Sequence, residues 1–283
     1  MADFTTLISC AELHASLRRA DWVVVDCRFT LIAPPAGRAA YDAGHIPGAR
    51  YADLDRDLSS PHVRGKTGRH PLPPINHFVE TLGTWGIGDG TQVVAYDANN
   101  GSMAARLWWL LQWLGHARVA VLDGGFQAWT ASGYEVTRDI PAHAPLRFMP
   151  RPRADLALDA HAVDRVRTDP RWRVLDARAA ERFRGENETI DPVPGRVPGA
   201  RSAPWGDNVL PDGRFRPTEE IRKRFAALLE DTPVERVVCY CGSGVTAAHD
   251  VLAMSHAGLG LARLYPGSWS EWITDPARPV ATG

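Results

Sequence analysis

A cysteine lies where a short apolar run ends and a glycine-containing turn begins. The run Val237-Val-Cys-Tyr240 has the β-branched character of a buried strand, and Cys241-Gly-Ser-Gly-Val-Thr-Ala247 then leads into a helical stretch over residues 248–254. Glycines at such a turn let successive N–H groups curl toward the Cys241 sulfur, and the helix adds the positive end of its dipole. Both effects favour a thiolate, so the turn predicts a nucleophilic cysteine. The alternative is a buried structural cysteine, the role that we expect for Cys239.

The chain repeats itself once at a long period. Trp22-Val-Val-Val-Asp-Cys-Arg28 returns as Trp172-Arg-Val-Leu-Asp-Ala-Arg178, and Val93-Val-Ala-Tyr-Asp97 returns as Val237-Val-Cys-Tyr-Cys241. Asp97 therefore stands where the second copy has its cysteine. The turn after Asp97 lacks a glycine at its first position, so we expect no cradle of N–H groups there. The repeat predicts two similar domains in tandem, of which the second carries the chemistry.

Each half alternates β-branched runs with helical patterns, which is typical of βα units on a mostly parallel, buried sheet. Strands are predicted at 23–26, 92–96 and 118–122 in the first half, and at 173–176, 236–240 and 262–265 in the second. Ser9 and Asp159 mark two helix starts. The proline-rich segment 140–153 predicts an extended linker between a domain of residues 1–139 and a domain of residues 154–283.

Composition excludes several classes of protein. The 283 residues include 32 Lys and Arg against 33 Asp and Glu, a net charge of -1, so no basic field favours nucleic acid or an anionic membrane. No run approaches the roughly 18 apolar residues of a membrane span. Four cysteines are too few for a disulfide scaffold, and the single C-x-C pair has no second pair to complete a zinc site. We expect a cytoplasmic protein with no metal and no cofactor.

Further repeated segments connect the chain with a known family. Pro-Gly-Ala recurs at Pro47 and Pro198, and the two halves end with Leu122-Asp-Gly-Gly125 and Gly267-Ser-Trp-Ser-Glu-Trp272. With the Cys241 loop, these segments resemble the tandem-domain rhodanese-like sulfurtransferases over essentially the whole chain. The loop is similar to that of the 3-mercaptopyruvate sulfurtransferase branch. The resemblance implies an α/β protein of two tandem rhodanese-like domains, each a mostly parallel five-stranded sheet flanked by helices, with a non-catalytic first domain.

The resemblance also implies which residues take part in a reaction through a cysteine persulfide. In the mercaptopyruvate branch the loop serine works with an Asp and a His of the first domain, and Ser243, Asp55 and His70 match these positions. Such a chain can polarise the donor's carbonyl group and move a proton as the C–S bond breaks. Arginines match the segment that binds the donor's carboxylate, a group that suits a guanidinium. The residues implied in donor binding are Arg182, Arg184, Gly242, Gly244, Val245 and Thr246.

The sequence departs from the family at one point. A second arginine is usual in the segment after Arg184, but residues 186–192 read Glu-Asn-Glu-Thr-Ile-Asp-Pro. A thiosulfate sulfurtransferase with the same persulfide is therefore the alternative. A cysteine phosphatase would need an arginine at Ala247, six positions after its cysteine, and a non-catalytic sulfur carrier would have no use for the implied triad.

The predicted function is the transfer of sulfane sulfur from 3-mercaptopyruvate, a small-molecule donor. The sulfur would pass through a persulfide on Cys241 to a thiol such as that of thioredoxin, or to cyanide, with release of pyruvate.

Overall fold

The computed structural model describes residues 3–283, and the chain divides into two compact units. Unit 1 comprises Met1–Ser60, Pro73–Arg153 and Pro211–Phe215, and unit 2 comprises Pro61–Leu72, Ala154–Leu210 and Arg216–Gly283. Each unit thus takes a short piece from the other half of the sequence. Within residues 3–283, no helix is both long and apolar enough to cross a membrane.

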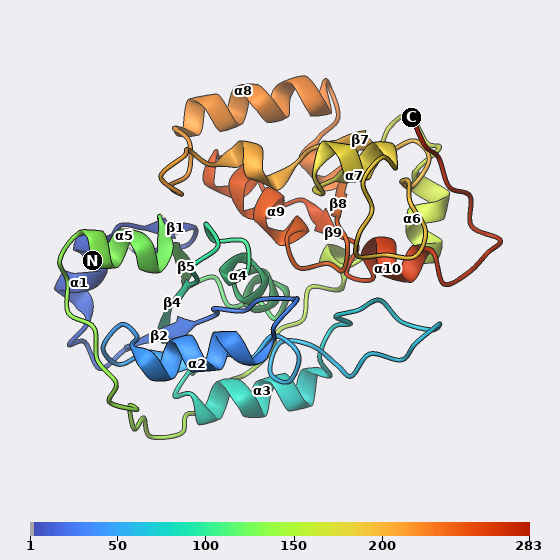
Figure 1. The fold of residues 1–283 in the computed structure, drawn as a ribbon. Coiled ribbons are helices and arrows are strands. Elements are labelled where there is room, and N and C mark those ends of the chain that lie inside the picture. Colours follow the sequence, from blue (N-terminus) through green and yellow to red (C-terminus); the bar gives the residue numbers. More distant parts are fainter. Residues whose placement is uncertain (1–2) are drawn as a thin grey trace. The chain divides into compact units, whose positions relative to one another are not determined.

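Unit 1 contains a fully parallel sheet with helices packed against it (Figure 1). Its strands are β1 (Leu7–Ile8), β2 (Trp22–Asp26), β3 (Arg50–Tyr51), β4 (Gln92–Tyr96) and β5 (Val119–Leu122). Its helices are α1 (Cys10–Ser16), α2 (Pro35–Ala43), α3 (Ile75–Thr84), α4 (Ala104–Trp113) and α5 (Gly125–Ala131). The strand order is β1-β5-β4-β2-β3, and every residue of β2 and β4 is buried. The predicted class of sheet is confirmed in this unit.

Unit 2 repeats the arrangement with a shorter sheet, in the order β7-β6-β8-β9 (Figure 1). Its strands are β6 (Arg173–Asp176), β7 (Arg201–Ser202), β8 (Val237–Tyr240) and β9 (Arg263–Leu264). Its α-helices are α6 (Ala160–Val166), α7 (Ala180–Arg184), α8 (Thr218–Leu229), α9 (Ala247–His256) and α10 (Ser268–Trp272). Three 3-10 helices complete it: η1 (Ala154–Leu156), η2 (Trp205–Asn208) and η3 (Val234–Arg236).

The expectation of five strands in each domain is wrong for unit 2. The position that β1 takes in unit 1 is here a single bridge between Ala157 and Leu264, with the Leu158 N–H donating to the Leu264 carbonyl (2.9 Å). The 3-10 helix η1 ends at Leu156, and Asp159 already caps the next helix. Residues 157 and 158 lie between them, the same number as in β1, but the pairing with β9 is limited to Ala157 and Leu264, so a bridge forms and not a ladder.

Both helix starts that the sequence marks are confirmed. Ser9 and Glu12 form a complete capping box at the start of α1. The Asp159 side chain accepts a hydrogen bond from the Ala162 N–H (2.7 Å) at the start of α6. These caps fix where each helix begins relative to the strand before it.

Residues 140–153 contain no helix or strand and run along unit 1. The Leu146 N–H donates to the Gly83 carbonyl (3.0 Å), and the Arg153 N–H donates to the Trp113 carbonyl (2.8 Å). The segment therefore packs on unit 1, and unit 2 resumes at Ala154.

Each unit has the same buried ion pair at the carboxyl end of a central strand. In unit 2, Arg178 Nη2 lies 2.6 Å from Asp176 Oδ2 and also donates to the Gly195 carbonyl (2.7 Å). In unit 1, Asp26 and Arg28 form the equivalent pair at 2.6 Å. Removing one partner of such a pair leaves a buried charge, so the pairs hold the strand ends and the loops beside them in place.

Helix α9 carries a second carboxyl group into the interior of unit 2. Asp250 is fully buried; its Oδ1 accepts a hydrogen bond from Asn208 Nδ2 (2.7 Å), and its Oδ2 has no hydrogen-bond partner among the described residues. Burial raises the pKa of Asp250 to about 7, although the Arg224 guanidinium, 3.8 Å away, acts in the opposite direction. In the native state Asp250 therefore keeps its proton up to about pH 7, whereas in the unfolded chain it releases this proton at about pH 4.

Asp250→Asn is expected to remove a pH-dependent loss of stability. As pH rises from about 4 to 7, the native state binds this proton more than the unfolded state does, so the free energy of unfolding of the wild type falls. Asparagine keeps the acceptor for Asn208 and stays neutral. The variant should gain up to about 4 kcal/mol at pH 8, at about 1.4 kcal/mol per pKa unit, and little at pH 4. Denaturant unfolding at both pH values measures this, and an equal gain at both would contradict it.

Candidate active site

The Cys241 loop lies between the end of β8 and the start of α9, and helix α10 holds it from one side. The Cys241 N–H donates to Ser268 Oγ (3.1 Å), and the Cys241 carbonyl accepts from the Trp269 N–H (3.0 Å). The Gly242 carbonyl accepts from the Ser270 N–H (2.9 Å). Cys241 is 2% exposed. These bonds fix the backbone on which the sulfur is carried.

Gly244 is required by the shape of the loop. Its φ is +74°, a conformation that side chains with a Cβ rarely adopt. A Cβ at this position would also collide with the carbonyl oxygen of Pro266. The turn therefore depends on glycine both for its dihedral angles and for its close approach to the neighbouring loop.

The corresponding turn of unit 1 contradicts the expectation that it forms no cradle. Asp97 Oδ1 accepts hydrogen bonds from the N–H groups of Asn99 (2.7 Å) and Gly101 (2.9 Å). Asp97 Oδ2 accepts from Met103 (2.7 Å) and Ala104 (2.8 Å). The glycine after Cys241 is therefore not needed for N–H groups to converge. Burial raises the pKa of Asp97 while these four donors act against it, and all four bonds suit a carboxylate.

The two turns match in position. The Asp97 carbonyl accepts from the Phe126 N–H at the start of α5 (2.8 Å), as the Cys241 carbonyl accepts from Trp269 at the start of α10. Each turn also leads from a buried strand into a helix, α4 in unit 1 and α9 in unit 2. The turn type thus holds an anion in unit 1. At the same place in unit 2 it would stabilise the negative charge of a thiolate or a persulfide.

Residues 61–72, which belong to unit 2, bring a histidine to the Cys241 loop. A Cβ on Gly68 would collide with the Gly267 carbonyl, so this segment lies directly against the start of α10. The Arg69 N–H donates to Ser270 Oγ (3.0 Å). His70 Nδ1 and Ser243 Oγ then form a hydrogen bond of 2.7 Å, with the two residues 4% and 7% exposed. Two of the three residues of the implied triad are thereby brought together.

Two acids form a cluster with arginines beside the loop, and one of the acids, Glu188, also lies 3.4 Å from Nη1 of the buried Arg178. The Arg182 Nε–H donates hydrogen bonds to both carboxylate oxygens of Glu188 (3.1 and 3.0 Å), and Arg182 Nη2 lies 3.1 Å from Asp191 Oδ2. Asp191 Oδ1 pairs with Arg69 Nη1. Burial acts to raise the pKa of Glu188, but hydrogen bonds from Arg182 and from two backbone N–H groups lower it overall. Glu188 is therefore ionised, and the acids of this segment hold the arginines in place.

The remaining predicted site residues lie in different surroundings. Asp55 is an exposed residue of unit 1, and its N–H donates to Asp53 Oδ1 (3.0 Å), so its role with His70 stays a prediction. Arg184 forms an exposed pair with Glu186 (2.7 Å) instead of lying beside Gly242. Along the loop, Val245 is buried at 3% exposure and Thr246 is the N-cap of α9.

The other thiols are less suited to catalysis. Cys10, Cys27 and Cys239 are free and buried, and burial raises the pKa of each, well above the usual value for Cys27 and Cys239. No group of three or more His, Cys, Asp or Glu residues placed to hold a metal ion occurs within residues 3–283.

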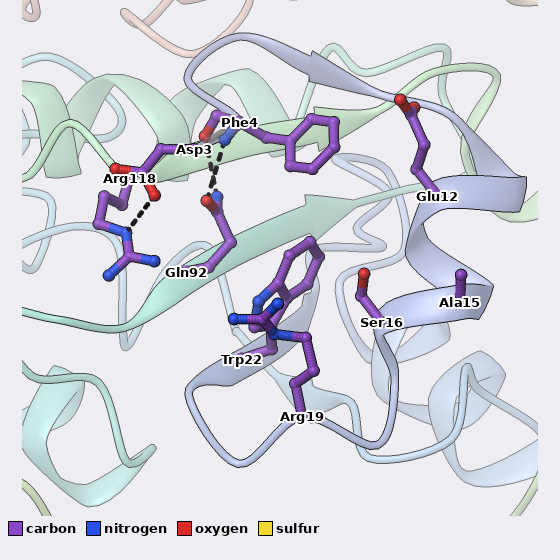
Figure 2. Close-up of a pocket in the computed structure, with 9 residues that line it drawn as sticks. All are labelled: Asp3, Phe4, Glu12, Ala15, Ser16, Arg19, Trp22, Gln92 and Arg118. Carbon is purple, nitrogen blue, oxygen red and sulfur yellow. Dashed lines mark hydrogen bonds and ion pairs between the residues drawn. The ribbon is translucent and has the colours of Figure 1, made fainter. Parts of the chain in front are cut away.

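A pocket of about 290 Å³ in unit 1 is another candidate site (Figure 2). Its polar groups are paired with one another: Arg118 Nε lies 3.0 Å from Asp3 Oδ1, and Gln92 exchanges two hydrogen bonds with the backbone of Phe4 (3.0 and 2.8 Å). The edge of the Phe4 ring meets the Trp22 ring. The pocket contains no thiol, so the chemistry expected from the sequence does not belong to it.

Arg69 is the functional candidate that the sequence analysis missed. It directly precedes His70, but nothing in that segment alone indicates a partner for it. The available signal was the pair of acids at 188 and 191, whose side chains are 2% and 1% exposed in the structure. Buried acids require cations, and after Arg178 and Arg182 have paired with Glu188 and with one oxygen of Asp191, the other oxygen of Asp191 still needs one.

Comparison with known proteins identifies the family of the chain. A model of the rhodanese-like domain matches residues 9–132 and 159–275. The chain is 51% identical over 278 residues to "Probable 3-mercaptopyruvate sulfurtransferase" of Pseudomonas aeruginosa, with 98% of each chain covered. It is 30% identical over 309 residues to "Thiosulfate/3-mercaptopyruvate sulfurtransferase 1, mitochondrial" of Arabidopsis thaliana, covering 97% of this chain and 77% of the relative.

Solved structures give the same result. The 3-mercaptopyruvate sulfurtransferase from Leishmania major superposes with a TM-score of 0.85 at 33% identity, over 95% of this chain and 74% of that one. The predicted tandem fold and the predicted class of enzyme are confirmed. The chain therefore belongs to the rhodanese-like family, as a tandem-domain sulfurtransferase.

Proposed function

We propose that this sulfurtransferase takes sulfane sulfur from 3-mercaptopyruvate, holds it as a persulfide on Cys241 and passes it to a thiol or to cyanide. The observation that carries this proposal is the hydrogen bond between His70 and Ser243, on the loop that bears Cys241. A donor whose carbon–sulfur bond breaks to give an enolate needs groups that polarise a carbonyl and move a proton. Thiosulfate has no carbonyl and no carbon to protonate.

In the first half of the reaction, the Cys241 thiolate attacks the sulfur of 3-mercaptopyruvate. A sulfur–sulfur bond forms and the carbon–sulfur bond breaks, with its electron pair moving onto carbon as the enolate of pyruvate. The proton from the donor's S–H group passes to that carbon, and His70 with Ser243 is placed to move it. The products are pyruvate and an ionised persulfide, whose negative charge the N–H groups of the turn would stabilise.

In the second half, an acceptor thiolate attacks the outer sulfur of the persulfide. The sulfur–sulfur bond breaks and its electron pair returns to Cys241 as a thiolate. We propose a protein thiol such as that of thioredoxin as the acceptor, with cyanide as an alternative that leaves as thiocyanate. Such an acceptor must be reduced, and all four cysteines of the chain are free thiols, so we propose the cytoplasm as the location.

The second candidate donor is thiosulfate, which would release sulfite and leave the same persulfide. The Arg182 guanidinium beside Gly242 favours neither donor, because it suits a carboxylate and a sulfonate alike. A phosphatase reaction is not supported, because Ala247, where an arginine would be needed, is the first residue of α9 and fully buried.

Mass spectrometry of the protein after exposure to each donor tests the proposal. 3-Mercaptopyruvate should add one sulfur that cyanide removes. Cys239 and Cys241 lie in one tryptic peptide, Val237 to Arg263, so fragmentation or the Cys239→Ser variant must locate the sulfur. Sulfur gained from thiosulfate and not from 3-mercaptopyruvate would overturn the choice of donor, and sulfur located on Cys239 would overturn the choice of residue.

A further inference from the structure

Two arginine nitrogens beside the Cys241 loop have no partner within the described part of the chain. Arg69 pairs through Nη1 with Asp191, and its Nη2 makes no hydrogen bond or ion pair. Arg182 uses Nε and Nη2 for Glu188 and Asp191, and its Nη1 makes none. Arg69 Nε is buried and also lacks a hydrogen-bond partner, so each guanidinium keeps at least one N–H-bearing nitrogen for another group.

These two arginine nitrogens, Arg69 Nη2 and Arg182 Nη1, both lie close to Gly242. A Cβ on Gly242 would lie 3.1 Å from Arg69 Nη2 and 3.7 Å from Arg182 Nη1. Because Gly242 has no side chain, two cations from distant parts of the sequence converge directly beside the residue that follows Cys241. Two cations at one place are held there against their mutual repulsion, which requires negative charge around them.

Asp191 and Glu188 supply this negative charge. Asp191 binds Arg69 through one oxygen and Arg182 through the other, and Glu188 binds Arg182 through both of its oxygens. The backbone of Arg69 is also tied to Ser270. The side chains of Arg69 and Arg182 are 22% and 16% exposed. Their orientation is therefore fixed by the protein before any ligand binds, which lowers the entropic cost of binding one.

We infer that Arg69 Nη2 and Arg182 Nη1 together bind the oxyanion of the sulfur donor, a carboxylate or a sulfonate, at Gly242. The inference rests on the proposed function, because it takes the donor to be the anion. Two N–H donors from separate guanidinium groups suit two oxygens of one oxyanion. A pocket of about 820 Å³ in unit 2 is lined by Arg69, Asp191 and Ser270, so one of the two arginines borders a space large enough for a small anion.

Protection of Cys241 from alkylation by iodoacetamide tests the inference without turnover. Inorganic sulfate is the probe, because it offers the oxyanion and no sulfane sulfur. Arg69→Ala and Arg182→Ala should each raise the sulfate concentration for half-protection by about tenfold or more, the usual effect of losing a charge-assisted hydrogen bond. Arg165→Ala is the control: an exposed arginine of α6 in unit 2, whose loss should change little.

Two further variants keep the inference open to refutation if Arg69→Ala folds poorly. Arg69→Lys retains a cation for Asp191 but lacks the second N–H-bearing nitrogen, so it should also weaken sulfate protection by about tenfold. Gly242→Ala should weaken it by placing a methyl group between the two nitrogens. Wild-type protection in Arg69→Lys or Arg69→Ala, or losses no larger than in Arg165→Ala, would overturn the inference.

Failure of the inference and failure of the proposed function give different results. If 3-mercaptopyruvate forms no persulfide but Arg69→Ala still loses sulfate protection, the donor is wrong and the anion site stands. If the persulfide forms normally and Arg69→Ala is protected like the wild type, the anion site is wrong and the donor stands. With whichever of the two sulfur donors proves to be a substrate, Arg69→Ala should raise KM by about tenfold with a smaller change in kcat, as expected for a group that binds the donor.

Discussion

Cys241→Ser should abolish sulfur transfer from both 3-mercaptopyruvate and thiosulfate, by about four orders of magnitude or more. A serine hydroxyl is far less acidic than a thiol and cannot carry sulfane sulfur. The exchange removes no volume of note and keeps the N–H to Ser268 bond that positions the loop, so the thermal midpoint should stay close to that of the wild type. Pyruvate release, sulfite release and thermal unfolding are the measurements.

Cys239→Ser is the matched control, and it should keep most of the activity. The two cysteines are two positions apart, so strand alternation alone would not separate them. Their surroundings do: Cys239 lies inside β8, paired in register with Leu175 and Leu264, and burial raises the pKa of its thiol well above the usual value. An inactive Cys239 variant beside an active Cys241 variant would show that the wrong cysteine has been chosen.

His70→Ala is expected to damage the two donor reactions unequally. Under the proposed function, His70 and Ser243 carry a proton to the enolate carbon, so the loss of their hydrogen bond should cost about 100-fold or more in kcat with 3-mercaptopyruvate. Thiosulfate needs no such proton, so its turnover should fall by less than about threefold. Steady-state kinetics with both donors, each followed to saturation, give the two values of kcat.

Ser243→Ala and the double variant show whether the two side chains act as one unit. If they do, each single variant and the double variant should lose mercaptopyruvate turnover to a similar extent, because removing either partner disables the pair. Asp55→Ala should show the same selectivity if Asp55 is the third member. Equal losses with the two donors in His70→Ala would refute the proton-transfer role and favour thiosulfate as the donor.

The features that the sequence predicted well are local ones. The strand Val237–Tyr240, the turn after it and the helix from Ala247 follow from a β-branched run, two glycines and a helical pattern in neighbouring residues. The caps at Ser9 and Asp159 need only three following residues to be recognised. Each of these elements is decided by interactions within one or two turns of chain, which a pattern in the sequence contains.

What the sequence analysis missed depends on contacts between distant segments. Arg69 and Asp191 are 122 positions apart, and only the placement of residues 61–72 in unit 2 makes them partners. For the same reason, Glu188 and Asp191, considered alone, stood only for the absence of the usual second arginine. In the folded chain they position arginines instead, because a buried carboxylate is stable only beside a cation.

The two units differ in what occupies the turn after the central strand. In unit 1 the turn contains the carboxylate of Asp97, which accepts hydrogen bonds from four N–H groups of that turn. Because this carboxylate is part of the chain, it takes the place that an anion from solution would otherwise have. The turn of unit 2 has its anion only when Cys241 carries charge, as thiolate or persulfide. A sulfur on Cys241 is bonded covalently and stays on the chain when it unfolds, so under the proposed function it alters unit 2 through the charge that it adds at this turn. The charge at the turn of unit 1 is thus permanent, whereas the charge at the turn of unit 2 would change within each catalytic cycle.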